Sequence, residues 1–128
     1  MRRRTILAFL VVVAVSGCGL FQVRDDLDRA MDVTSEYIRL IAAGKTRKAY
    51  GLTSSAWQAS VPYEKFAGWA ASHRSQYQEL ADEPDLGVRG ATREDSAYYV
   101  TVMLDGMSQT WKVMPEDGKW VLDVPKPE

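Results

Sequence analysis

The hydrophobic period of the chain changes partway along its length, and this change limits the folds that it can adopt. From Val23 to Ala70, apolar residues recur at steps of three and four, which is typical of amphipathic helices. From Ser96 to Val124 they alternate with polar residues, as in strands with one buried face. Helices followed by antiparallel strands predict an α+β domain, with N-terminal helices packed on an antiparallel sheet of three to four or more strands.

Three helices are predicted in the first half of the chain. The first starts near Val23 and ends at Gly44, because glycine is a frequent C-terminal stop. Thr46 is expected to cap a short second helix that continues to Leu52, and Pro62 to occupy the first position of the third. The faces expected to be buried carry Val23, Leu27, Ala30, Met31, Thr34, Tyr37, Ile38, Ile41 and Ala42 in the first helix, and Phe66, Trp69, Ala70 and His73 in the third.

Two turn signals divide the second half of the chain into strands. They are Asp105-Gly106 and Glu116-Asp117-Gly118, which favour tight hairpin turns. The strands that they separate are predicted at Ser96–Leu104, Met107–Met114 and Lys119–Val124. Their core-facing residues are expected to be Tyr98, Val100, Val102, Leu104, Trp111, Val113, Trp120, Leu122 and Val124. A weaker strand is predicted at Leu86–Thr92, where Gly87 and Gly90 lower the strand propensity.

The start of the chain has the order of features found in an export signal. Three arginines follow Met1, and Ile6–Val15 is an apolar run of about half the length that a spanning helix needs. Small Ser16 and Gly17 then precede Cys18, the chain's single cysteine. This order resembles a bacterial lipoprotein signal with its lipobox. The resemblance implies cleavage between Gly17 and Cys18 and lipidation of Cys18. The competing interpretation is an ordinary secretory signal with an incidental cysteine.

The resemblance to a lipoprotein signal predicts both the segments of the chain and its location in the cell. Residues 1–17 are the expected signal peptide, 18–22 a lipidated tether and 23–128 a single α+β domain. Lipid on Cys18 would hold the protein in the cell envelope. Gly19 is not the aspartate that retains many lipoproteins in the inner membrane, which favours the outer membrane, facing the periplasm, in a Gram-negative cell. In any other cell the outer face of the plasma membrane is expected.

The charge of the processed chain argues against one class of partner. Removing residues 1–17 takes away three of the 16 basic residues and none of the 17 acidic ones, which leaves 111 residues with a net charge of −4. Nucleic-acid binding depends on neutralising phosphates, so no nucleic-acid partner is expected. An acidic domain as a whole also gains nothing from an anionic membrane surface.

Four segments occur in an order that is typical of one family. They are Ile41–Lys45, Ala49–Ser54, Tyr63–Phe66 and Val113–Leu122. Together, over most of residues 25–124, they resemble small bacterial lipoproteins of the nuclear-transport-factor-2-like (cystatin-like) superfamily. The resemblance implies that the antiparallel sheet is curved and wrapped on helices, often as a cone with an apolar pocket. Many members of this superfamily have no known activity.

Aromatic residues are the main candidates for ligand binding, because concave aromatic surfaces bind small apolar ligands or peptides. Trp57 lies in a polar stretch and is the best candidate for an exposed contact. Aromatics at helix and strand periods usually belong to the core, which is the competing interpretation for Trp69, Trp111 and Trp120. The candidate ligand-binding residues are Trp57, Tyr63, Trp69, Tyr99 and Trp111.

Two hypotheses of different classes follow. The first is a non-enzymatic envelope lipoprotein that binds a small apolar ligand, a peptide or a partner protein through an aromatic pocket or the sheet face. The alternative is a pocket hydrolase or isomerase that uses Asp123 or His73, although His73 has no carboxylate at helical spacing. The sequence shows no spacing of metal ligands, so neither a metal nor another cofactor is expected. A homodimer formed through the sheet is a further hypothesis.

Overall fold

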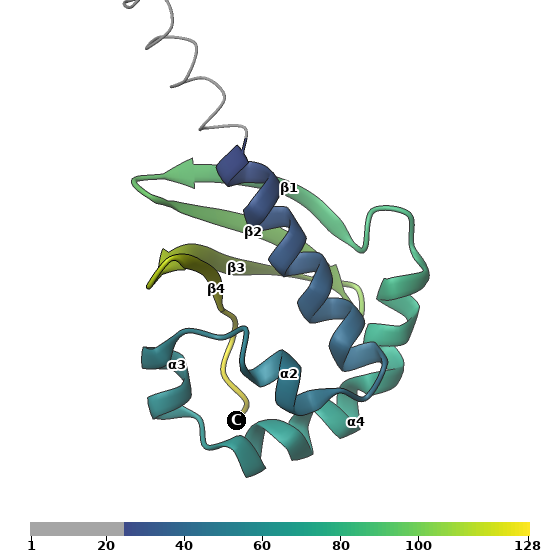
Figure 1. Cartoon of the computed structure of the whole chain (residues 1–128). Coiled ribbons are helices and arrows are strands. Elements are labelled where there is room, and N and C mark those ends of the chain that lie inside the picture. The colour runs from purple at the N-terminus through teal and green to yellow at the C-terminus, as the bar shows by residue number, and fades with distance from the viewer. Residues whose placement is uncertain (1–24) are drawn as a thin grey trace, which may run out of the picture.

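The computed structural model describes residues 25–128, and within them the predicted α+β architecture is confirmed. The expected signal peptide, tether and helix start at Val23 lie outside the described residues. The helices are the N-terminal helix (25–42), α2 (Thr46–Tyr50), α3 (Ser55–Ser60) and α4 (Tyr63–Asp82). The strands are β1 (Val88–Glu94), β2 (Ala97–Leu104), β3 (Met107–Glu116) and β4 (Lys119–Asp123) (Figure 1). They form one curved antiparallel sheet in the order β1-β2-β3-β4.

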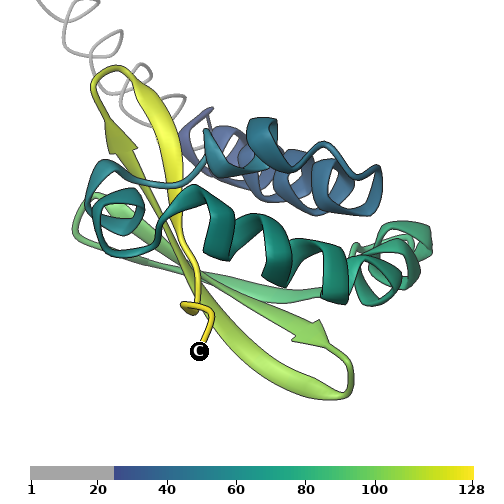
Figure 2. The same ribbon diagram turned by 90° about the horizontal axis from the view of Figure 1, so that it is seen from below.

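The helices gather on one face of the sheet (Figure 2). The alternation along β2 and β3 directs the predicted core residues towards them, and Val100, Val102 and Trp111 are fully buried. Trp120 is only half-buried, whereas Val121, on the other side of β4, is 1% exposed. Alternation therefore predicted β2 and β3 well and β4 only in part.

Tight turns connect the strands where the sequence signals lie. Asp105-Gly106 and Asp117-Gly118 all have positive φ angles, and they join β2 to β3 and β3 to β4. The weaker strand is displaced from its predicted bounds and runs as β1 from Val88 to Glu94. Gly87 precedes it with φ of 73°, and a Cβ there would lie 2.3 Å from the Leu80 side chain. Gly87 therefore permits a close approach between α4 and the sheet.

The helix ends confirm one predicted signal and correct two. At Gly44, the amides of Gly44 and Lys45 donate to the carbonyls of Ile41 and Leu40, which is the Schellman arrangement that ends a helix. Thr46 was expected to cap α2 but is its first helical residue, and its hydroxyl instead contacts the Tyr63 hydroxyl at 3.0 Å. Pro62 is the N-cap of α4, so the helix begins one residue later than predicted.

The short helix α3 was not predicted. Its N-cap is Ser54, whose hydroxyl accepts the Trp57 amide at 3.1 Å and donates to the Asp123 carboxylate. The backbone of Ser54 also extends the sheet, because its amide donates to the Leu122 carbonyl at 3.0 Å. The Ser55 amide donates to Glu116, which lies on the same sheet face as Val121. The start of α3 thus wraps around the β4 edge, which accounts for the burial of Val121.

Aromatic rings connect the helices to the sheet. Trp111 of β3 lies edge-on to Tyr37 of the N-terminal helix, with ring centroids 5.4 Å apart, and parallel to Tyr77 of α4 at 6.4 Å. The hydroxyl of Tyr37 is fully buried and has no hydrogen-bond partner in the described part of the chain. Burial raises the pKa of Tyr37 well above its usual value, and the nearby Tyr77 phenol adds to this effect. Burial also raises the pKa of Tyr77.

These two phenols make stability sensitive to alkaline pH. Their pKa is raised in the folded state, so above about pH 10 the unfolded chain releases protons that the folded chain retains. The stabilisation is complete below that pH and is lost as the pH rises. We expect the free energy of unfolding to fall by about 1.4 kcal/mol per pH unit for each tyrosine. Urea unfolding at several pH values above 9.5 measures the slope.

Tyr37→Phe is the matched variant for this prediction. It removes one titrating phenol and an unpaired buried hydroxyl. We expect it to halve the alkaline slope and to raise stability at pH 7 by about 1 kcal/mol. Tyr99→Phe, on the half-exposed sheet face, serves as the control with little effect. An unchanged slope in Tyr37→Phe would contradict the assignment.

Candidate binding groove

A groove of about 710 Å³ lies between α4, the turn from β2 to β3 and the C-terminal segment. Its α4 wall includes Trp69, His73 and Tyr77, and the sheet contributes Leu104, Met107 and Gln109. Residues 124–128 form the opposite wall. The volume is within the range of roughly 300–1,000 Å³ that is usual for ligand sites.

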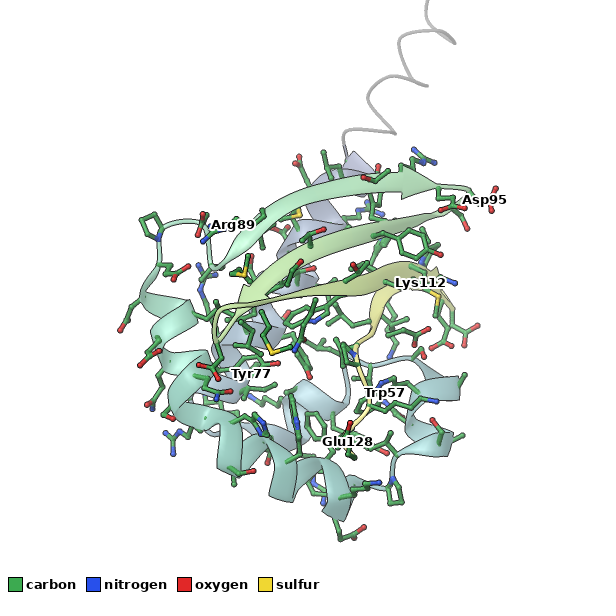
Figure 3. All side chains as sticks on the ribbon, turned by 180° about the vertical axis from the view of Figure 1, so that it is seen from behind. Trp57, Tyr77, Arg89, Asp95, Lys112 and Glu128 are labelled. Carbon is green, nitrogen blue, oxygen red and sulfur yellow. The ribbon has the colours of Figure 1, made fainter. Side chains whose placement is uncertain are left out.

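Contacts between distant parts of the chain hold the groove walls in place. The Trp57 indole donates to the Val124 carbonyl at 2.7 Å, and this bond fixes the start of the C-terminal segment. Figure 3 shows Trp57 beside the segment that leads to Glu128. At the other end, the Gln76 amide donates to Asp105 at 3.2 Å and ties α4 to the β2–β3 turn.

Trp69 and His73 form a stacked pair of rings on the α4 wall of the groove. They are one helical turn apart on α4, and their rings stack with centroids 4.9 Å apart and planes 26° apart. His73 Nδ1 lies 2.8 Å from the Trp69 carbonyl oxygen. A carbonyl only accepts hydrogen bonds, so Nδ1 carries a proton and donates it to this oxygen, which leaves Nε2 directed away from the Trp69 backbone. The wall therefore offers an extended ring surface that carries two polar groups, the Trp69 indole N–H and His73 Nε2.

The groove combines an aromatic floor with a rim of mixed charge. Tyr77 lies at its inner side and stacks on Trp111. Charged side chains of both signs line the groove, namely Glu64, Lys65, Asp105, Lys126 and Glu128. Met107 is 70% exposed at its edge and offers an adaptable apolar contact. Such a lining suits an occupant with apolar and polar groups together.

The five predicted ligand-binding residues do not form one site. Only Trp69 lines the groove. Trp57 is 3% exposed, so the expectation of an exposed contact is wrong, because the C-terminal segment packs on it. Trp111 is completely buried and supports the floor from behind. Tyr63 lies beneath the Arg47 guanidinium, 4.0 Å from its ring centroid, and Tyr99 is half-exposed on the sheet face away from the helices.

The two candidates for acid–base chemistry also lie apart. His73 is in the groove, but Asp123 is absent from its lining and accepts a hydrogen bond from Ser54 at the start of α3. Asp123 faces Lys112 across the sheet, on the side away from the helices. The structure therefore does not bring His73 and Asp123 together as an acid–base pair.

Gln76, Tyr77 and Met107 are among the groove residues that were not predicted from the sequence. Gln76 and Tyr77 follow Trp69 at the next helical steps, so extending the period beyond His73 identifies them. Met107 directly follows a predicted turn, where an exposed apolar side chain is unusual. The contribution of residues 124–128 carried no local signal, because their position depends on Trp57.

Residues 25–128 contain neither a candidate metal site nor a candidate membrane-spanning helix. No group of three or more histidine, cysteine or acidic residues could hold a metal ion. None of the described helices has both the length and the apolar composition needed to cross a bilayer. Comparisons of the chain with protein-family models, with curated proteins and with solved structures give no match.

Proposed function

We propose that this chain is a lipid-anchored envelope protein, not an enzyme, which binds a peptide segment of a partner protein in the α4 groove. The stacked Trp69 and His73 rings in an open groove of mixed polarity are the observation that supports this proposal most directly. An apolar side chain of the peptide packs on these rings. Its backbone and polar groups meet the charged rim and the Nε2 atom of His73.

The anchor and the finer fold assignment belong to the same proposal. The basic start, short apolar run and Cys18 support lipidation at that cysteine and a place in the cell envelope. Helices covering one face of a curved antiparallel sheet are compatible with a nuclear-transport-factor-2-like or cystatin-like cone. In such a cone, Tyr37, Tyr77 and Trp111 fill the space between helices and sheet. The ligand therefore binds in the groove beside α4.

The groove is tested by a display library of random peptides selected on the immobilised full chain. We expect enriched peptides to carry an aromatic or large aliphatic residue and to bind Trp69→Ala at least about tenfold more weakly, since a well-packed aromatic contact is worth about 1.5 kcal/mol or more. Isothermal titration of the enriched peptides measures the affinities.

Tyr99→Ala is the matched control, because it removes another half-buried aromatic ring on the opposite sheet face. It should leave peptide affinity unchanged. Peptides that bind wild type and Trp69→Ala equally, or that lose affinity only in Tyr99→Ala, would place the binding surface elsewhere and refute the groove.

A further inference from the structure

A second, smaller cavity lies at the opposite end of the sheet from the β2–β3 turn. Its volume is about 250 Å³, and it is lined from the N-terminal helix by Asp26 and Arg29. The other lining residues come from the two hairpin ends, namely Arg93, Ser96, Pro115, Gly118, Lys119 and Trp120. Both hairpins turn at the same side of the sheet (Figure 1). The cavity is therefore assembled from three separate parts of the chain.

Cations dominate this lining, although the processed chain as a whole has a net charge of −4. Three cationic residues line the cavity, Arg29, Arg93 and Lys119, together with one acidic residue, Asp26. Arg29 also pairs with Asp25 at 3.0 Å, but both side chains are more than half exposed, so solvent screens this pair. The lining residues thus carry three positive charges and one negative charge, with Asp25 paired to Arg29 and Glu116 opposite Lys119 in the β3–β4 register just outside the lining.

Trp120 adds an aromatic surface. It is half-buried and packs on Tyr98, with ring centroids 6.0 Å apart. The Arg93 guanidinium lies over the Tyr98 ring, 5.7 Å from its centroid. A tryptophan beside arginine and lysine is the combination that proteins present to the headgroup region of a bilayer.

The position of the cavity relative to the anchor decides the ligand class. Asp26 comes eight residues after Cys18, and an extended chain spans at most about 3.6 Å per residue. A lipidated Cys18 therefore keeps this end of the domain within about 30 Å of the bilayer surface. The groove beside α4 is lined instead by the β2–β3 turn, at the far end of the strands.

We propose that this cavity binds the zwitterionic headgroup of a phospholipid, resting on the anchoring in the proposed function. Arg29, Arg93 and Lys119 hold the phosphate, and Asp26 accepts hydrogen bonds from the ammonium group. The cavity is smaller than an ordinary ligand pocket, so it takes the headgroup and leaves the acyl chains in the bilayer. Binding orients the domain and directs the α4 groove away from the membrane.

Headgroup binding is tested on the full chain carrying Cys18→Ser, which has no acyl group, in an uncharged maltoside detergent. Glycerophosphoethanolamine is titrated while the indole N–H signal of Trp120 is followed by NMR. We expect a saturable shift of that signal and about tenfold weaker binding in Arg93→Gln and in Lys119→Gln, since each loses a hydrogen bond to a charged group. Lys48→Gln, which removes the same charge from exposed α2, should bind as the parent chain does.

Three outcomes overturn the proposal. If inorganic phosphate binds as tightly as glycerophosphoethanolamine, the cavity is a simple anion site. If glycerophosphoglycerol binds as tightly, the ammonium group and Asp26 do not contribute to recognition. If the NMR signal of the Trp120 indole N–H does not shift in the folded Cys18→Ser chain, the cavity does not bind the headgroup. The anchor is judged separately by acylation of the wild type, because the Cys18→Ser chain reports headgroup binding whether or not Cys18 is ever acylated.

Discussion

Trp111→Ala is expected to lower the free energy of unfolding by about 3–5 kcal/mol. Trp111 is completely buried on β3, where it contacts Tyr37 of the N-terminal helix and Tyr77 of α4. The substitution removes the apolar surface that joins these two helices to the sheet, and it leaves a cavity that rigid strands cannot close. Because small domains have a stability of only about 5–15 kcal/mol, the variant should lie close to its unfolding threshold.

Thermal and urea unfolding of the Trp111→Ala chain, followed by circular dichroism, measure this loss. Trp120→Ala is the matched control, since the same side chain is removed from a half-buried position on the neighbouring strand. Its loss should be less than half as large. Equal losses in the two variants would contradict the central position of Trp111 between the layers.

Local pattern was sufficient for the elements with a strong period. The alternation through Tyr98, Val100 and Val102 predicted β2, and the two Asp-Gly turns predicted the hairpins on either side of β3. Gly44 marked the end of the N-terminal helix. In these places the local conformational preference and the tertiary packing agree, so residues a few positions apart are enough to predict the element.

The elements that local pattern missed depend on distant contacts. Helix α3 has only six residues, which is too short to be stable alone, and Ser54 at its start is held by Asp123 from the last strand. Trp57 lies in a polar stretch, yet Val124 accepts its indole proton and the chain covers it. Neither contact can be predicted from the sequence around residues 54–58, because the partner residue of each lies in or after the last strand.

The candidate groove was predictable only in part for the same reason. Trp69 and His73 were identified from the helix period, and their stacking follows from the spacing of one turn. The opposite wall comes from residues 124–128, more than fifty positions later in the chain. The separation of His73 from Asp123 is likewise a property of topology, since the two residues lie on a helix and a strand that are fifty positions apart in the chain.

Cys18→Ala is expected to abolish incorporation of labelled palmitate and to leave a protein longer by the 17 residues of the signal. The physical reason is that lipidation requires the cysteine sulfur, and signal cleavage before residue 18 follows that modification in the lipoproteins that this start resembles. Growth with labelled palmitate, followed by gel electrophoresis and intact-mass measurement, tests both effects. Ser16→Ala is the control, because it keeps a small residue before the cleavage site and should be labelled and cleaved as the wild type is.

The number of acyl chains determines how completely the protein stays with the membrane. One chain of ordinary length gives only marginal, reversible binding, at about 0.8 kcal/mol per buried methylene, whereas two or three chains give a persistent anchor. We therefore expect wild-type protein to remain in the membrane pellet after high-salt and carbonate washes, which remove proteins held by charge. Wild-type protein that is unlabelled, or that these washes release, would show that Cys18 carries no such anchor and that the N-terminal segment is an ordinary secretory signal.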